Sequence, residues 1–88
     1  MNEKELERVL KAMANRRRLS IVKFLKKEKE ASVGDIAAEI RLSLKATSKH
    51  LTVLKGARLV DSEQRGFQAR YTLVANIPEA ARRIFSLL

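Results

Sequence analysis

The stretch LSLKATSKHLTVLKGARLV, which runs from Leu42 to Val60, contains no Asp and no Glu. The chain has 10 acidic residues in 88, and seven of them precede Leu42. Ser43 suits the N-cap of a helix over 44–57, because its hydroxyl can accept a hydrogen bond from a free N–H of the first turn. The stripe of this helix that we expect to be buried is Thr47, Leu51 and Leu54. Its opposite face is polar and basic.

The preceding segment, SVGDIAAEI, predicts a shorter helix. Ser32 and Asp35 form a variant of the capping box that begins many helices. The apolar positions repeat at helical spacing and are Val33, Ile36, Ala37 and Ile40. Only Arg41 and Leu42 separate this helix from the next one. Two short helices with a tight connection, the second basic on its outer face, are typical of a helix-turn-helix.

Two further helices are predicted before this pair. Apolar residues at helical spacing and acids in the first turns indicate a helix over 3–13. Asn15 suits the N-cap of a second helix, whose segment RRRLSIVKFLKK carries a wide apolar arc. We interpret the following segment, KEKEA, as a polar connection.

After the helix-turn-helix the apolar period changes from 3.6 to 2. The segments LVDSEQ and FQARYTLV predict two strands about Arg65 and Gly66. One face of the second strand is expected to hold Phe67, Ala69, Tyr71 and Leu73. Pro78 suits the first turn of a last helix over 78–88. The expected fold is mostly α with a small β-hairpin, a winged helix-turn-helix of order α-α-α-α-β-β-α forming a single domain, 1–88.

Charge and composition narrow the class of protein. Lys and Arg total 19 against 10 acids, which gives a net charge of +9 and favours a polyanionic partner, most often nucleic acid. The alternative is a solvated basic surface without such a role. The chain has no cysteine, which excludes disulfides and thiolate metal sites and fits a reducing cytoplasm. No apolar run approaches the length of a membrane span and the N-terminus is no signal peptide, so we expect a cytoplasmic protein.

Taken in order, these segments resemble the ArsR-type winged-helix transcriptional regulators. The opening signature of that family is matched by Ala14, Asn15, Arg18, Leu19 and Ile21. Its helix-turn-helix resembles SVGDIAAEI and SKHL followed by Val53 and Leu54, and its wing is similar to RGFQARYTL. The similarity covers about Val9 to Leu73.

The resemblance also shows departures. The family often has Pro where Arg16 stands and Gly where Arg41 and Arg58 stand, so these two arginines are expected to need a strained, left-handed backbone. Metal-sensing members carry Cys pairs in the first helix of the helix-turn-helix, or His and Asp ligands on the last helix. The corresponding segments here, SVGDIAAEI and PEAARRIFSLL, have neither set. We therefore expect no metal or other cofactor, and the residues name no small-molecule effector.

The helix over 44–57 is the predicted reading helix of double-stranded DNA. Its candidate contacts are Ser43, Leu44, Lys45, Ser48, Lys49, His50 and Thr52. His50 lies between the buried and outer faces, which favours a partly buried structural residue that also touches a phosphate. The candidate wing contacts are Arg65, Gly66 and Arg70, although Asp61 and Glu63 on the same hairpin can pair with those arginines instead. We assign Arg18 a structural role.

The terminal helices carry the prediction of a homodimer. A small three-helix core leaves apolar stripes on the helices over about 3–13 and 78–88 to be covered. The predicted interface residues are Leu6, Val9, Leu10, Met13, Ile77, Ala81, Ile84, Phe85 and Leu88. The alternative is that both helices pack within their own chain. A two-fold dimer would place its reading helices about 34 Å apart on a pseudo-palindromic operator.

These observations predict a homodimeric, sequence-specific DNA-binding regulator that represses transcription. Two other functions fit the same fold, namely a winged-helix protein-interaction module and a nonspecific, chromatin-like DNA-binding module. An enzyme is not expected, because the chain has no carboxylate pair at catalytic spacing, no Ser-His-Asp pattern and no phosphate-binding glycine loop.

Overall fold

The computed structural model describes all 88 residues and contains five helices and three strands. In chain order they are α1 (Glu3–Met13), α2 (Arg16–Glu28), β1 (Glu30–Ser32), α3 (Val33–Ile40), α4 (Leu44–Gly56), β2 (Val60–Arg65), β3 (Gln68–Leu73) and α5 (Glu79–Phe85). The predicted helices and hairpin are confirmed, and α5 is shorter than the predicted 78–88. Three of the predicted caps also form, because the side chains of Asn15, Ser32 and Ser43 each accept a backbone N–H three residues later.

The strand β1 was missed, since it falls in the segment that we interpreted as a polar connection. It pairs with β3 in an antiparallel sheet of order β1-β3-β2, with Ala31 opposite Tyr71. Three residues are too few to show an alternating pattern, and the partner strand lies far along the chain. The winged-helix order is therefore α-α-β-α-α-β-β-α.

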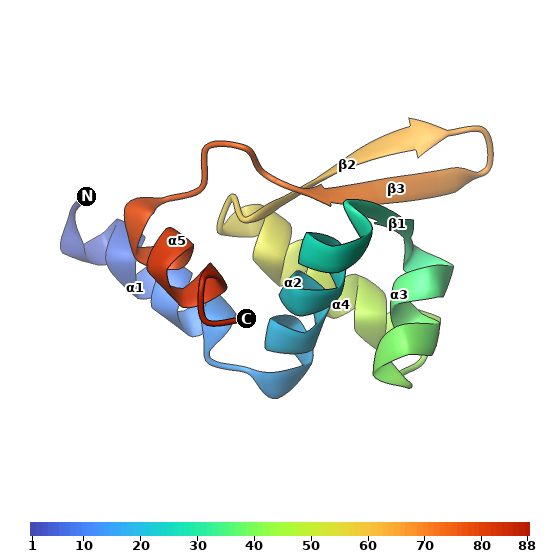
Figure 1. Cartoon of the computed structure of the whole chain (residues 1–88), viewed down its shortest axis with the longest axis horizontal. Helices are drawn as coiled ribbons and strands as arrows, with labels where there is room; N and C mark the ends of the chain where they lie inside the picture. The colour runs from blue at the N-terminus through green and yellow to red at the C-terminus, as the bar shows by residue number, and fades with distance from the viewer.

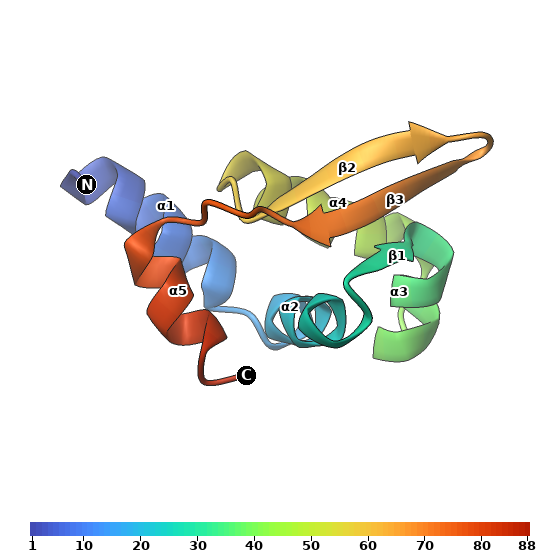
Figure 2. The ribbon, with the colours of Figure 1, turned by 45° about the horizontal axis from the view of Figure 1, so that its top comes forward.

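The core lies between the helices and one face of this sheet. The helix α2 is central, because it contacts α1, α3, α4, β1 and β3. Its buried residues are Ile21, Val22 and Leu25, and α4 contributes the predicted stripe Thr47, Leu51 and Leu54. The helices α1 and α5 lie side by side at one end of the molecule, and the β2–β3 hairpin extends beyond α3 at the other (Figures 1 and 2).

The connections around α4 are held in left-handed conformations, as expected from the missing glycines. Arg41 has φ 55° and ψ 53°, and Arg58 has φ 61°. After Arg41, the Leu42 N–H donates to the Ala37 carbonyl at 3.0 Å, and after Arg58 the N–H of Leu59 donates to the Leu54 carbonyl at 3.0 Å. These are the long hydrogen bonds of Schellman motifs, which close α3 and α4.

The hairpin separates apolar from charged side chains. Val60, Ser62 and Gln64 of β2 lie opposite Leu73, Tyr71 and Ala69 of β3, and this face of the sheet turns toward the helices. The other face carries the hairpin charges, which are Asp61, Glu63, Arg65 and Arg70. The predicted alternation is confirmed for Tyr71 and Leu73, which pack on the core. It is wrong for Phe67, which follows Gly66 in the turn beyond the end of the strand and is fully exposed.

Candidate nucleic-acid interface

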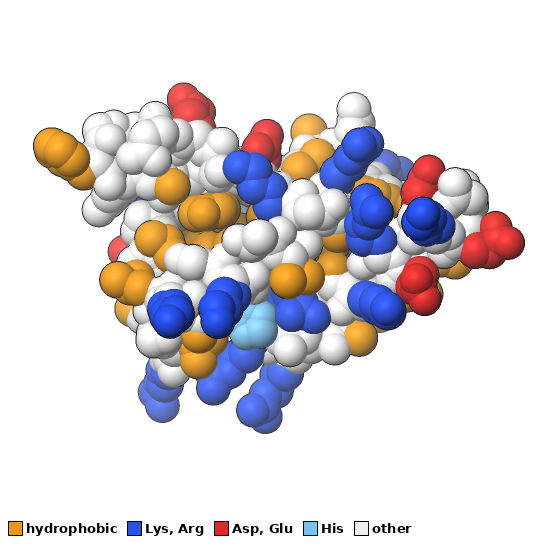
Figure 3. Space-filling view, turned by 180° about the vertical axis from the view of Figure 1, so that it is seen from behind, with side chains coloured by type: hydrophobic (Ala, Val, Ile, Leu, Met, Phe, Trp, Pro, Cys, Tyr) orange, Lys and Arg blue, Asp and Glu red, His pale blue; other side chains and the backbone are white.

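The outer face of α4 is exposed and basic. Its exposed residues include five predicted DNA contacts, namely Leu44, Lys45, Ser48, Lys49 and Thr52. Neither Lys45 nor Lys49 has a carboxylate within salt-bridge distance, since the four ion pairs of the chain all involve Arg65, Arg70 or Arg83. Figure 3, a view from behind Figure 1, shows Lys and Arg side chains gathered on both sides of the single histidine. The structure therefore brings these α4 side chains together on one surface with free ammonium groups.

A side-chain hydrogen bond lies at each end of α4. The Ala46 N–H donates to Ser43 Oγ at 3.1 Å, so Ser43 acts as the N-cap. At the other end, Lys55 Nζ donates to Ser62 Oγ on β2 at 2.7 Å. This bond links the hairpin to the last turn of α4, which also packs against β2.

His50 is half-buried and its ring is held by Arg18 of α2. Arg18 Nη1 lies 3.2 Å from His50 Nδ1, while Arg18 Nε and Nη2 donate to the carbonyls of Ala12 and Lys11 at 2.6 and 3.0 Å. A guanidinium is always a donor, so His50 Nδ1 is the acceptor and the neutral ring carries its proton on Nε2. Burial lowers the pKa of His50, and the charges of Arg18 and Arg17 lower it further. These contacts hold the His50 ring against α2, and the structural assignment of Arg18 agrees with them.

The two wing arginines are engaged with an acid that the sequence did not single out. Glu30 Oε1 of β1 accepts from Arg65 Nη1 at 3.0 Å and from Arg70 Nη2 at 3.3 Å. Arg65 also lies 3.6 Å from Glu63, whereas Asp61 only accepts its neighbour's backbone N–H. Acidic residues therefore do pair with the wing arginines, as expected, but the main partner of these arginines is Glu30. No sequence signal marked this residue, because β1 itself was missed.

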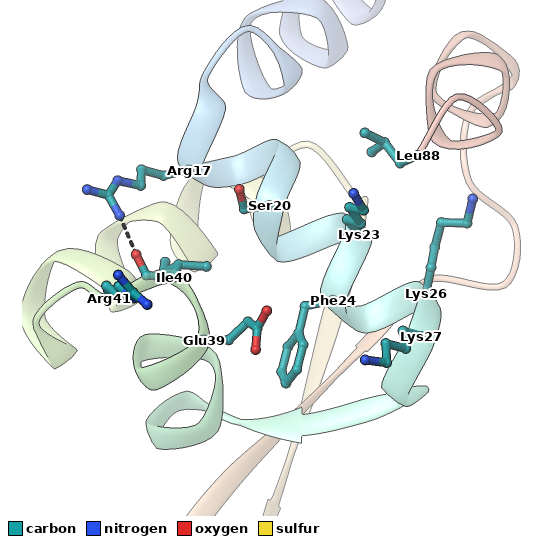
Figure 4. Close-up of a pocket in the computed structure, with 10 residues that line it drawn as sticks. All are labelled: Arg17, Ser20, Lys23, Phe24, Lys26, Lys27, Glu39, Ile40, Arg41 and Leu88. Atoms are coloured by element: carbon teal, nitrogen blue, oxygen red, sulfur yellow. Dashed lines mark hydrogen bonds between the residues drawn. The ribbon is translucent and has the colours of Figure 1, made fainter.

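A second basic surface, not predicted as a site, lies between α2 and the end of α3 (Figure 4). Arg17 Nη1 donates to the Ile40 carbonyl, which fixes its guanidinium at the end of α3. Lys26 Nζ donates to the Phe85 carbonyl at 2.7 Å. The surface is an open depression whose cations are Arg17, Lys23, Lys26, Lys27 and Arg41. None of them forms an ion pair.

The nine predicted dimer residues divide into three groups by burial. Four of the nine lie in the core of the single chain, where α1 and α5 pack on each other, and these are Val9, Met13, Ala81 and Phe85. These four side chains are already covered within one chain, because an amphipathic stripe shows that a helix is covered without showing which element covers it. Leu6 and Leu10 are 37% and 48% exposed. The remaining three are partly buried and are Ile77, Ile84 and Leu88.

No three His, Cys, Asp or Glu side chains lie close enough together to hold a metal ion. None of the five helices has the length and apolar character needed to cross a membrane.

Known proteins share this fold along nearly the whole chain. A possible ArsR-family regulator from Mycobacterium bovis, solved as a homodimeric winged helix-turn-helix DNA-binding domain, has a TM-score of 0.82 and 33% identity, covering 96% of this chain and 74% of that one. The structure of HlyU from Vibrio cholerae has a TM-score of 0.82 and 32% identity, covering 99% of this chain and 92% of that one. The transcriptional repressor PagR of Bacillus anthracis has a TM-score of 0.77 and 27% identity, covering 96% and 92%.

Sequence comparison gives the same family. The Vibrio cholerae protein, described as the transcriptional activator HlyU, is 39% identical over 80 residues, which cover 83% of this chain and 73% of that protein. The family model of bacterial regulatory proteins of the arsR family matches residues 15–62, more than half of the chain. The chain therefore belongs to the ArsR family and is a winged helix-turn-helix, DNA-binding transcription regulator.

Proposed function

We propose that this chain is a homodimeric, sequence-specific repressor that reads the major groove of its operator with α4. The observation that carries the proposal is the exposed face of α4, on which Lys45 and Lys49 have no ion-pair partner. The 13 residues of α4 span about 20 Å, which is enough to cross a major groove about 12 Å wide. Lys side chains there bind guanine edges or phosphates, and Ser48 has a hydroxyl to contribute.

The proposed dimer joins two copies through α1 and α5. Exposed apolar side chains on α1, Leu6 and Leu10, supply the area that a partner copy would cover. The similar Mycobacterium bovis domain is described as homodimeric. Two α4 helices related by a two-fold axis would meet successive major grooves about 34 Å apart, so the operator is an inverted repeat.

We propose that the chain represses transcription by occupying a promoter. Relatives carry both directions in their descriptions, since HlyU is named an activator and PagR a repressor. Transcription in vitro from a promoter that contains the selected operator distinguishes the two, because a repressor lowers transcript yield in proportion to operator occupancy. The proposed location is the cytoplasm, where bacterial DNA lies.

The experiment that tests this function is selection of bound duplexes from a random library at near-physiological salt. An enriched inverted repeat is expected, and Lys45→Ala with Lys49→Ala should weaken binding to it at least about 10-fold, since the change removes two phosphate or base contacts. The matched control is Lys4→Ala with Lys29→Ala, which removes the same charge from exposed positions away from α4 and from the second basic surface. Sedimentation should show the same dimer for all variants.

Two results would contradict the proposal in different ways. Uniform, salt-sensitive binding without an enriched sequence would point to a nonspecific, chromatin-like module, for which the unpaired cations on α2 and Arg41 already provide a second surface. An intact dimer that binds no duplex would point to a protein-interaction module.

A further inference from the structure

The tip of the hairpin presents an aromatic ring that the fold does not use. Phe67 is 105% exposed, the highest value among the large apolar side chains of the chain. The register of β2 and β3 leaves only Gly66 and Phe67 in the turn, with φ of 62° at Gly66. A positive φ at the first central residue alone is the pattern of a type II′ hairpin turn, which needs glycine there and leaves the second position free for a side chain. The turn is braced by Gln64 Nε2, which donates to the Gly66 carbonyl at 3.1 Å.

The position of the tip explains why Phe67 finds no cover. The hairpin extends past α3 in both ribbon views, so its end stands clear of the helices (Figures 1 and 2). The ring is therefore available to a partner molecule, while Tyr71 and Leu73 of the same hairpin are already packed on the core.

The arginines of the hairpin bond to acidic residues, so the Phe67 ring is the group of the hairpin that remains free to contact a partner. Arg65 and Arg70 both bond to Glu30, and Arg65 also lies near Glu63. All of these groups lie on the outer face of the sheet, whereas the face toward the helices has the uncharged Gln64 and Ala69 near the tip. The wing is thus poor in unpaired positive charge, and what it offers to DNA near its end is mainly apolar.

We propose that Phe67 acts as an apolar wedge that enters the minor groove beside the major groove occupied by α4 and partly unstacks one base step. The inference rests on the proposed function. The hairpin packs against the end of α4, where Lys55 bonds to Ser62, so docking of α4 also brings the tip close to the duplex. Apolar side chains that enter the minor groove in this way bend DNA, and flexible pyrimidine–purine steps deform most easily. Phe67 is then a specificity-determining residue that favours such a step in the flank of each half-site.

The test uses the full chain and the duplex recovered by selection, with 2-aminopurine placed at successive flanking positions. Binding of the wild-type protein should raise the fluorescence at one step per half-site, because 2-aminopurine brightens when unstacked. Phe67→Ala should abolish that rise and weaken binding by about 5- to 100-fold, the range for loss of an aromatic–base contact. The dependence of affinity on salt should not change, because no charge is lost.

Two further variants separate the wedge from other roles of the tip. Phe67→Leu keeps an apolar side chain and should retain most of the fluorescence rise. Phe67→Lys replaces the ring by a cation, so it should lose the fluorescence rise even where the added charge tightens binding and steepens its salt dependence. A fluorescence rise as large as that of the wild type in this variant would overturn the wedge.

Failure of the inference differs from failure of the function on which it rests. Specific binding with equal affinity and equal fluorescence for wild type and Phe67→Ala overturns the wedge alone, and would leave the ring to a protein partner. Absence of specific binding by the wild-type chain overturns the proposed function together with the wedge.

Discussion

Replacing Arg41 by glycine should stabilise the protein. Arg41 sits at φ 55° and ψ 53°, in the left-handed region that costs a residue with a Cβ about 1–2 kcal/mol. Its guanidinium forms no ion pair, so the substitution breaks no such contact. Glycine gives back about 0.4–1 kcal/mol through the greater entropy of the unfolded chain. The difference leaves a gain of about 0.5–1 kcal/mol, or roughly 2–8 °C in Tm for a domain of this size.

Urea unfolding measures this gain, at one fixed protein concentration because dimerisation would add to the apparent stability. The control is Arg41→Ala, which removes the same charge but keeps a Cβ and therefore the strain. Its free energy of unfolding should stay within about 0.5 kcal/mol of wild type. If the glycine variant were no more stable than the alanine variant, the strain assigned to this connection would be refuted.

Two other changes test groups around the reading helix. Glu30→Gln should lower the free energy of unfolding by no more than about 1 kcal/mol, since the ion pairs that it breaks are partly solvated. The same change should tighten operator binding, because it frees two wing arginines and removes a negative charge. Fluorescence anisotropy measures the affinity, and weaker binding would contradict this prediction. Folding lowers the pKa of His50, so the unfolded chain binds a proton more readily than the folded protein does. The stability present above the unfolded pKa of about 6.5 should therefore be lost as pH falls from that value toward the lower pKa of the folded protein. Urea unfolding between pH 5 and 8 should show this slope in wild type and a shallower one in His50→Gln.

The helices were predictable because their signals are local. Caps such as Asn15 and Ser43 lie within three residues of the N–H groups that they accept, and the apolar period of α4 is contained within its own 13 residues. The strain at Arg41 and Arg58 was also predictable, since the resemblance placed glycine at both positions. Local sequence was therefore enough for the reading helix and its N-cap.

Features that depend on distant pairing were not predictable in the same way. The strand β1 exists through its ladder with β3, and Glu30 reaches Arg70 across 40 residues of sequence. The exposed position of Phe67 depends on where the hairpin turn falls, since a shift of register would have placed the ring on a face of the strand. The apolar stripes of α1 and α5 were visible, but whether they meet each other or a second copy is a matter of tertiary packing.

The three bonds of Arg18 have a mechanical consequence for operator spacing. One guanidinium joins the last carbonyls of α1 to the middle of α4, so the reading helix cannot tilt relative to α1 without breaking a bond. In a dimer formed through α1, the distance between the two reading helices then depends on the Arg18 bonds within each subunit as well as on the contacts between the subunits. Any event that displaces α1, or that protonates His50 and so repels Arg18, would change that distance and with it the fit to a half-site spacing fixed by the pitch of the DNA.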